Sequence, residues 1–211
     1  MNTETNTRRF FFWGDLLKAN PVIKFLIFGD VVFFSAAGLL GPIFALFVVD
    51  FIQGGSAEVA GIAIAIYLIT KSLFQIPAAA LIDKICGDKD DFWFIFGSLI
   101  FASFIPLSYL FISTPFELYV AQFLLGLAFA FQFPSFMALF TKYIPDSKEA
   151  TMWGLYFTML DLASAATAAL GGYLAITFGF QSVILAVSVF ELIGAFMFVP
   201  IYKHIKRNPV C

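Results

Sequence analysis

The sequence predicts an all-α integral membrane protein with six transmembrane helices. Of its 211 residues, 61% are hydrophobic and only 12% are charged, and the mean hydropathy is +0.94. A soluble domain of this length needs more charge on its surface. The apolar runs are continuous over roughly 20 residues and do not alternate with a period of two, which favours helices over a β-barrel. The six runs are 22–49, 59–82, 92–112, 117–140, 150–177 and 180–202.

Short polar segments separate the six runs, so we expect no separate soluble domain. Glycine, proline, serine and charged residues, which favour turns, fill these segments. Residues 1–20 are polar and then aromatic, with basic residues beside the aromatic ones, as in a segment that lies on a membrane surface. The expected parts are an N-terminal cytoplasmic or interfacial segment over 1–20, a six-helix domain over 21–203 and a cytoplasmic tail over 204–211.

The basic residues predict the orientation of the chain. Lysine and arginine number four before or at the start of the first helix, two after the second, two after the fourth and three after the sixth, and the other three loops have none. Basic residues are enriched in cytoplasmic loops. We therefore expect a multi-pass protein of the cell (plasma or inner) membrane, in contact with lipid, with both termini in the cytoplasm.

Four ionisable residues lie inside the predicted helices. A rise of about 1.5 Å per residue places Asp30, Lys71, Asp161 and Glu191 roughly 13 to 18 Å from one end of their helices, near the middle of the bilayer. An ionisable group is costly there unless it is paired, hydrated or neutral. The four residues are therefore candidates for binding a solute or coupling protons.

Structural interpretations remain open for two of the four. Lys71 can form an ion pair with Asp30 on a neighbouring helix, and such a pair can also open when a solute or a proton binds. Glu191 can hydrogen-bond a neighbour in its protonated form, on a sixth helix at the periphery.

Two helices carry polar, small and aromatic residues on one face. Gln122 and Gly126 are four residues apart on the fourth helix, and Phe34 follows Asp30 by one turn on the first. Such faces line a cavity, or they bring helices into close contact through small residues. Gln122, Gly126 and Phe34 are candidates for the substrate site on the first interpretation.

Several function classes lack their sequence motifs. No Walker A sequence, G-x-S-x-G, H-E-x-x-H or metal-ligand cluster is present, and the basic residues only flank apolar runs. We therefore expect no enzyme, no cofactor, no bound metal and no nucleic-acid partner. The expected partners are lipid and a small-molecule or ion substrate.

The segment 79–89, between the second and third helices, reads A-A-L-I-D-K-I-C-G-D-K. It resembles the cytoplasmic signature of the major facilitator superfamily of transporters, G-x-x-x-D-(R/K)-x-G-(R/K)-(R/K), and Asp83 and Lys84 match it. The resemblance implies a gating loop, in which Asp83 lies beside the start of a helix in the opposite half of the transporter and steadies the outward-facing state.

The loop also departs from this signature. Ala79 replaces the first glycine, and Gly87 comes one residue late. Asp88, just before Lys89, stands where a basic residue is expected. The resemblance therefore assigns Gly87, Asp88 and Lys89 to the gating loop on position alone.

Two further helices resemble the family. The segment 168–180 reads A-A-L-G-G-Y-L-A-I-T-F-G-F and is similar to the family's G-G-x-L-A-x-x-x-G-(W/F) in the fifth helix. The resemblance implies helix contacts at Gly171 and Gly172, and at Ala79 of the second helix. In the fourth helix the family pattern R-x-x-x-G has Gln122 in place of the base, which puts proton coupling in doubt.

The family normally has twelve helices in two similar halves, and this chain resembles one half. Residues 42–47 (P-I-F-A-L-F) resemble 134–140 (P-S-F-M-A-L-F), as in an inverted three-plus-three helix repeat. The resemblance implies a secondary transporter in which two copies form a homodimer and move a small solute by alternating access, with proton coupling as one option. The fifth helix of the second copy, near Glu149, is then the expected contact of Asp83. The alternatives are a subunit of a heterodimeric transporter and a membrane scaffold that does not transport.

Overall fold

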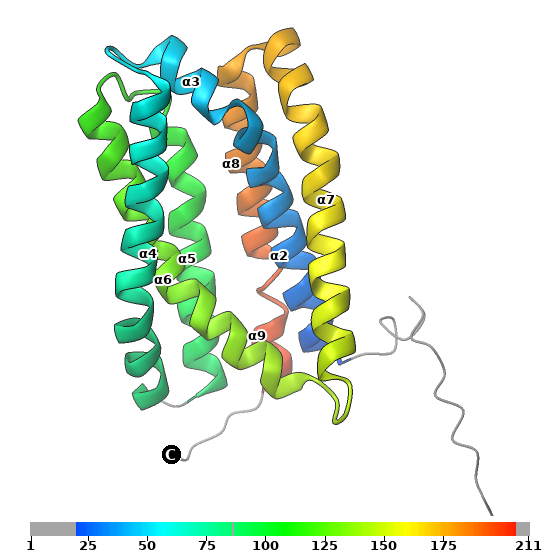
Figure 1. Ribbon diagram of the computed structural model, residues 1–211. Helices are drawn as coiled ribbons and strands as arrows, with labels where there is room; N and C mark the ends of the chain where they lie inside the picture. Colours follow the sequence, from blue (N-terminus) through cyan, green and yellow to red (C-terminus); the bar gives the residue numbers. More distant parts are fainter. Residues whose placement is uncertain (1–19, 86, 206–211) are drawn as a thin grey trace, which may run out of the picture.

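The computed structural model describes residues 20–85 and 87–205, and all six predicted spans are helical (Figure 1). Each span is long and apolar enough to cross a membrane. Of the expected N-terminal segment 1–20, residues 1–19 lie outside the described residues. Of the expected tail 204–211, residues 206–211 also lie outside them. The helices are α2 (Pro21–Leu40), η1 (Gly41–Ile43), α3 (Phe44–Phe51), α4 (Ala57–Ile85), α5 (Asp88–Ser108), α6 (Pro115–Tyr143), α7 (Glu149–Phe178), α8 (Phe180–Phe196) and α9 (Ile201–His204).

The first span is not one uninterrupted helix. It changes from α2 to the 3-10 turn η1 at Gly41 and then continues as α3. Pro42 has no backbone N–H to donate and its ring crowds the preceding turn, so a regular helix is interrupted here. The last span is interrupted in the same way before α9, where Pro200 is the N-cap residue.

Two helix starts are fixed by side chains near the chain reversals. At α2 the Asn20 side chain accepts a hydrogen bond from the backbone N–H of Val22 at 2.9 Å. At α6 Thr114 and Glu117 form a reciprocal capping box, with Pro115 between them in the first turn. These groups satisfy backbone donors that a helix start leaves without partners. The box explains why α6 begins at Pro115, slightly before the apolar run.

The first three spans and the last three spans form two groups, and the helices of each group pack mainly on helices of the other group. The first helix of each group contacts the second and third helices of the other, since α2 packs on α7 and α8 while α6 packs on α4 and α5. The third helices, α5 and α8, pack on each other. This reciprocal pattern is the inverted three-plus-three arrangement expected from the sequence.

Figure 1 shows α4 and α7 at the two sides of one face, with α2 and part of α6 between them and α8 behind α2. These two outer helices are much less buried than the others. The buried share of the apolar window is 17% in α4 and 11% in α7, against 39% to 50% in the other four spans. The fold therefore leaves α4 and α7 with long exposed surfaces on either side of the same face.

Candidate functional site

A cavity of about 330 Å³ lies within the bundle. Its lining comes from the first, second, third, fourth and sixth spans. Most of the lining is apolar, as in typical binding sites for small molecules. Its aromatic side chains are Phe34, Phe44, Tyr67, Tyr109 and Phe129, and its amide and carboxyl groups come from Gln122 and Glu191.

Three candidates from the sequence, Phe34, Gln122 and Glu191, meet in this lining. The Gln122 amide donates a hydrogen bond to the hydroxyl oxygen of Tyr109 at 2.9 Å. Glu191 is buried, and its Oε2 atom accepts no hydrogen bond from the described residues. A buried polar atom without a partner is unusual. Glu191 thus belongs to the cavity lining and carries one buried carboxyl oxygen without a partner among the described residues.

The cavity is open on one side. Gly41 and Ile64 belong to its lining, and both are exposed in a single copy. Ile64 lies on α4, which borders the face seen in Figure 1. A single chain therefore does not enclose this site.

Rings from three helices lie at the lower boundary of the cavity. The ring centroids of Phe34 and Phe129 are 5.4 Å apart, and Phe129 is 6.1 Å from both Phe33 and Tyr67. Asp30 lies one turn below Phe34 along α2, toward the lower end of the bundle in Figure 1. This aromatic layer therefore lies on the side of the cavity toward Asp30.

Asp30 is buried in a second polar cluster below that layer. Its carboxyl group accepts hydrogen bonds from the hydroxyl of Tyr156 at 2.5 Å and from the amide of Gln132 at 3.3 Å. The three residues come from α2, α7 and α6. Both donors are neutral, so the described residues provide hydrogen bonds to this carboxyl group but no cation.

The structure does not contain the ion pair between Lys71 and Asp30 that the sequence left open. The Lys71 ammonium lies 4.7 Å from the ring centroid of Phe133. The reason is the helix packing, because α4 packs mainly on α6 whereas α2 packs mainly on α7 and α8. Lys71 is partly buried, and it is held by a cation–π contact.

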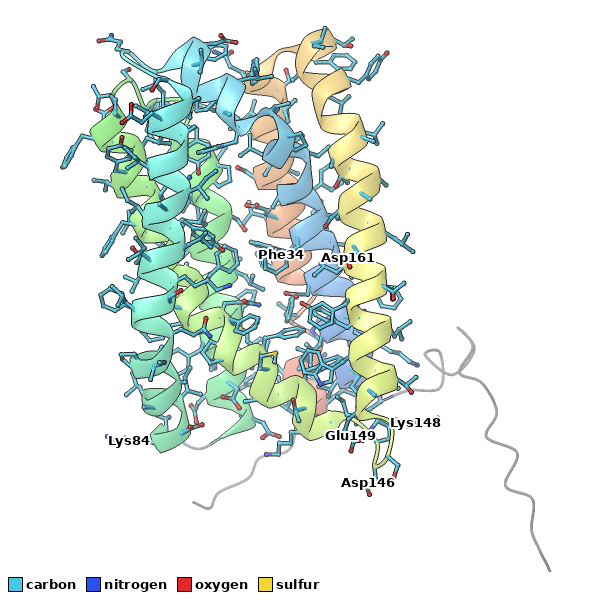
Figure 2. All side chains as sticks on the ribbon, in the orientation of Figure 1. Phe34, Lys84, Asp146, Lys148, Glu149 and Asp161 are labelled. Atoms are coloured by element: carbon cyan, nitrogen blue, oxygen red, sulfur yellow. The ribbon has the colours of Figure 1, made fainter. Side chains whose placement is uncertain are left out.

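The remaining two candidates are not part of the cavity lining. Gly126 is buried, and a Cβ atom added to it would lie 2.6 Å from the backbone oxygen of Tyr67, so it brings α6 close to α4. Asp161 is exposed on α7. Figure 2 shows Asp161 and Phe34 at the same height of the bundle.

The expected gating loop is anchored by Asp88. This residue is buried and pairs with Lys142 of α6, and it also accepts a hydrogen bond from the hydroxyl of Tyr143 at 2.7 Å. The acid that replaces the family's base therefore ties the start of α5 to the end of α6. In the same loop Gly87 is the N-cap residue of α5, Asp83 and Lys84 are exposed, and Lys89 lies 4.6 Å from the ring centroid of Tyr202.

The three expected helix-contact residues differ in their surroundings. Gly171 is buried against the backbone of Leu39, so it lies where α7 meets α2. Gly172 has open space where a Cβ atom would lie, and Ala79 is partly buried on α4. Within one copy, Gly171 shows a tight backbone contact and the adjacent Gly172 shows none.

Sequence reasoning missed several residues of these sites, among them Tyr109 in the cavity lining and Gln132 and Tyr156 beside Asp30. Gln132 could have been identified from the sequence, since it is an amide side chain in an apolar helix. The two tyrosines could not, because tyrosine is also common as an anchor at membrane interfaces. The described residues contain no group of three or more His, Cys, Asp or Glu side chains that could hold a metal ion.

Comparisons with known proteins agree with this fold. The family model of the Major Facilitator Superfamily matches residues 26–210, and no curated protein matches the chain. Among solved structures, the chain is similar to an auto-inhibited peptide transporter of the POT family, with a TM-score of 0.72 and 16% sequence identity. The match covers 89% of this chain and 38% of that transporter, so the chain spans well under half of its length. Because the family model matches most of the sequence, the chain belongs to the major facilitator superfamily.

Proposed function

We propose that the protein is a secondary transporter that moves a small solute by alternating access. The observation that carries this proposal is the cavity of about 330 Å³ within the bundle, whose lining includes Glu191, a buried acid with one unpartnered carboxyl oxygen. Membership of a transporter family agrees with it. In such transporters the solute site lies near the midplane, between two repeats that rock against each other.

Two parallel copies of the chain form the proposed transport unit. One copy leaves its cavity open at Gly41 and Ile64, and the exposed surfaces of α4 and α7 lie at the two sides of the face in Figure 1. A second copy facing this side encloses the cavity between two equivalent halves. The solute then binds between the copies, and its access alternates as they rock.

The lining favours a compact apolar solute that carries a positive charge or a hydrogen-bond donor. The lining includes five aromatic rings and Glu191, but no lysine, arginine or histidine. An organic ammonium group can pair with the carboxylate and contact the faces of the rings at the same time. A buried carboxylate otherwise lacks a counter-charge, which is unfavourable. Glu191 is thus the proposed selector for a cationic solute.

Asp30 is the proposed proton-coupling residue, and the loop around Asp83 is the proposed gate. The Asp30 carboxyl group is buried and has neutral partners, so the protein can hold it with or without a proton. Asp83 is exposed at the lower end of the bundle. There it is proposed to contact the start of α7 of the second copy, near Glu149. The proposed location is the cell membrane, with both termini in the cytoplasm.

Uptake of benzyltrimethylammonium into proteoliposomes tests this function. Wild-type protein is expected to raise uptake above that of protein-free vesicles, and Glu191→Gln is expected to lower the protein-dependent uptake by at least about tenfold. Glu58→Gln makes the same chemical change at an exposed position of α4 and is expected to have no effect. If the Glu191→Gln protein transports as well as wild type, Glu191 is not the selector. If neither this cation nor a panel of other small solutes enters, transport itself is contradicted.

A further inference from the structure

Two residues of opposite charge lie on the outer helices without a charged partner. Asp161 is exposed on α7 and forms no hydrogen bond or ion pair with a described residue. Lys71 on α4 contacts the ring of Phe133, and no described carboxylate lies within 4.0 Å of its ammonium. The fold thus leaves Asp161 and Lys71, which lie well inside the two least buried helices, without an ion pair among the described residues.

These two charges lie at nearly the same depth. With a rise of about 1.5 Å per residue, Asp161 is about 18 Å above the start of α7 and Lys71 about 21 Å above the end of α4. Both helix ends are at the lower end of the bundle (Figure 1), and Figure 2 shows Asp161 about midway along α7. Unpaired charges are costly at this depth of a bilayer, and an oppositely charged partner from outside the chain offsets that cost.

A second copy supplies both partners. The two helices border the same face, so a twofold axis parallel to the helices and in front of that face places α4 of each copy against α7 of the other (Figure 1). This rotation does not change depth. We infer that Lys71 of each copy forms an ion pair with Asp161 of the second copy, twice per dimer. This ion pair rests on the proposed homodimer, and it is the contact that fixes how the two copies pair.

The surroundings of the two charges allow this approach. On α7, Thr158 and Ala165 flank Asp161 by about one turn on either side, and both are exposed. Next to Lys71 on α4, Ser72 is also exposed. Small side chains let transmembrane helices come close together. Phe133 is itself 37% exposed, so the cation–π contact holds the ammonium near the surface of the copy.

A second copy is favoured over other partners because this one chain carries both signs at matching depth. An anionic lipid headgroup lies at the membrane surface and does not reach the midplane. A different chain would need the complementary acid and base at these same two depths. In the twofold arrangement, the same sequence supplies both the acid and the base of each ion pair.

Charge reversal in lipid vesicles tests the ion pair. Copies labelled with a donor or an acceptor dye report association by energy transfer. Lys71→Glu alone and Asp161→Lys alone each place like charges together in both contacts, so self-association is expected to weaken by at least about tenfold. When the two variants are mixed, both contacts again join opposite charges, and association is expected to return to near the wild-type level. Asp146→Lys, in the exposed loop before α7, serves as the charge control.

The mixture also controls for folding, because recovered association requires that both variants are folded. If wild-type copies associate but the mixture does not, the ion pair is overturned while the homodimer stands. If wild-type copies do not associate, both are overturned. A chain with Lys71→Met and Asp161→Asn combined provides a further check. Wild-type association of that neutral chain would show that the pair does not hold the dimer together.

Discussion

At the scale of single residues, Asp30 has an environment that suits both of its protonation states. The Tyr156 hydroxyl donates to a carboxylate, and after rotation about its C–O bond it can accept from a carboxylic acid. Gln132 can donate in either state. The carboxyl group can therefore gain and lose a proton while it keeps both of these partners.

The variant Asp30→Asn tests this role. Asparagine keeps the size and the hydrogen-bonding capacity of the side chain but cannot release a proton. Uptake driven by a pH gradient is expected to fall to the level measured without a gradient, while exchange of labelled for unlabelled solute continues. Asp50→Asn, at the exposed end of α3, is expected to change neither rate. Gradient-driven uptake at the wild-type rate in Asp30→Asn contradicts the coupling role.

Tyr156→Phe is expected to destabilise the protein through the same cluster. It removes the donor at 2.5 Å and leaves the buried carboxyl group with Gln132 alone. Loss of one partner from a buried polar group costs about 1 to 3 kcal/mol. Thermal unfolding in detergent, followed by tryptophan fluorescence, measures the effect. Tyr173→Phe removes a hydroxyl from an exposed position of α7 and is the matched control, and equal unfolding midpoints for the two variants would contradict the buried hydrogen bond.

The depth of the ionisable residues could be read from the sequence, but their partners could not. Counting residues along a helix gives depth, and Asp161 lies at the expected height. Partners depend on how each helix is rotated and which helix it packs on. Asp30 therefore accepts a hydrogen bond from Tyr156 of α7 and does not pair with Lys71, because α2 packs on α7 and not closely on α4.

At the scale of helices, α2 and α7 approach each other closely at Gly171. A Cβ atom at Gly171 would overlap the backbone of Leu39, whereas a Cβ atom at the adjacent Gly172 would meet nothing within 4 Å. The two glycines are neighbours in the same helix, yet only one faces a backbone at close range. This difference could not be predicted from the Gly-Gly pair in the sequence.

Alanine substitution separates the two positions. Gly171→Ala must push α2 and α7 apart, and overpacking of this kind costs about 1 to 3 kcal/mol. Gly172→Ala introduces no overlap and improves helix propensity by up to about 1 kcal/mol. Unfolding midpoints in detergent are expected to fall for the first variant and to stay level or rise for the second. A Gly171→Ala protein as stable as wild type would contradict the close contact.

The existence of the helices was predictable, and their interruptions less so. Continuous apolar runs identified all six spans, because the bilayer requires that length of apolar helix. Gly41 and Pro42 indicated a weak point, but only the structure places the 3-10 turn there. The pairing of Asp88 with Lys142 was also beyond the sequence, since it joins the start of α5 to the end of α6.

At the scale of the whole molecule, the burial of the helices is uneven, as the proposed dimer requires. The spans α4 and α7 bury little of their surface within one copy, and the cavity is open at Gly41 and Ile64. The sequence predicted the six-helix class and its family, because helix length and loop signatures are local properties. It could not predict which residues line the cavity, since those come from five spans of the chain.

Labelling of one cavity residue from both sides of the membrane tests alternating access in this protein. Ala37 lines the cavity and is replaced by cysteine in a chain that also carries Cys86→Ser and Cys211→Ser. In vesicles with one protein orientation, a membrane-impermeant maleimide is expected to react with this cysteine when added to either side, and bound solute is expected to slow both reactions. Reaction from one side only, or no reaction from either side, would contradict alternating access through this cavity.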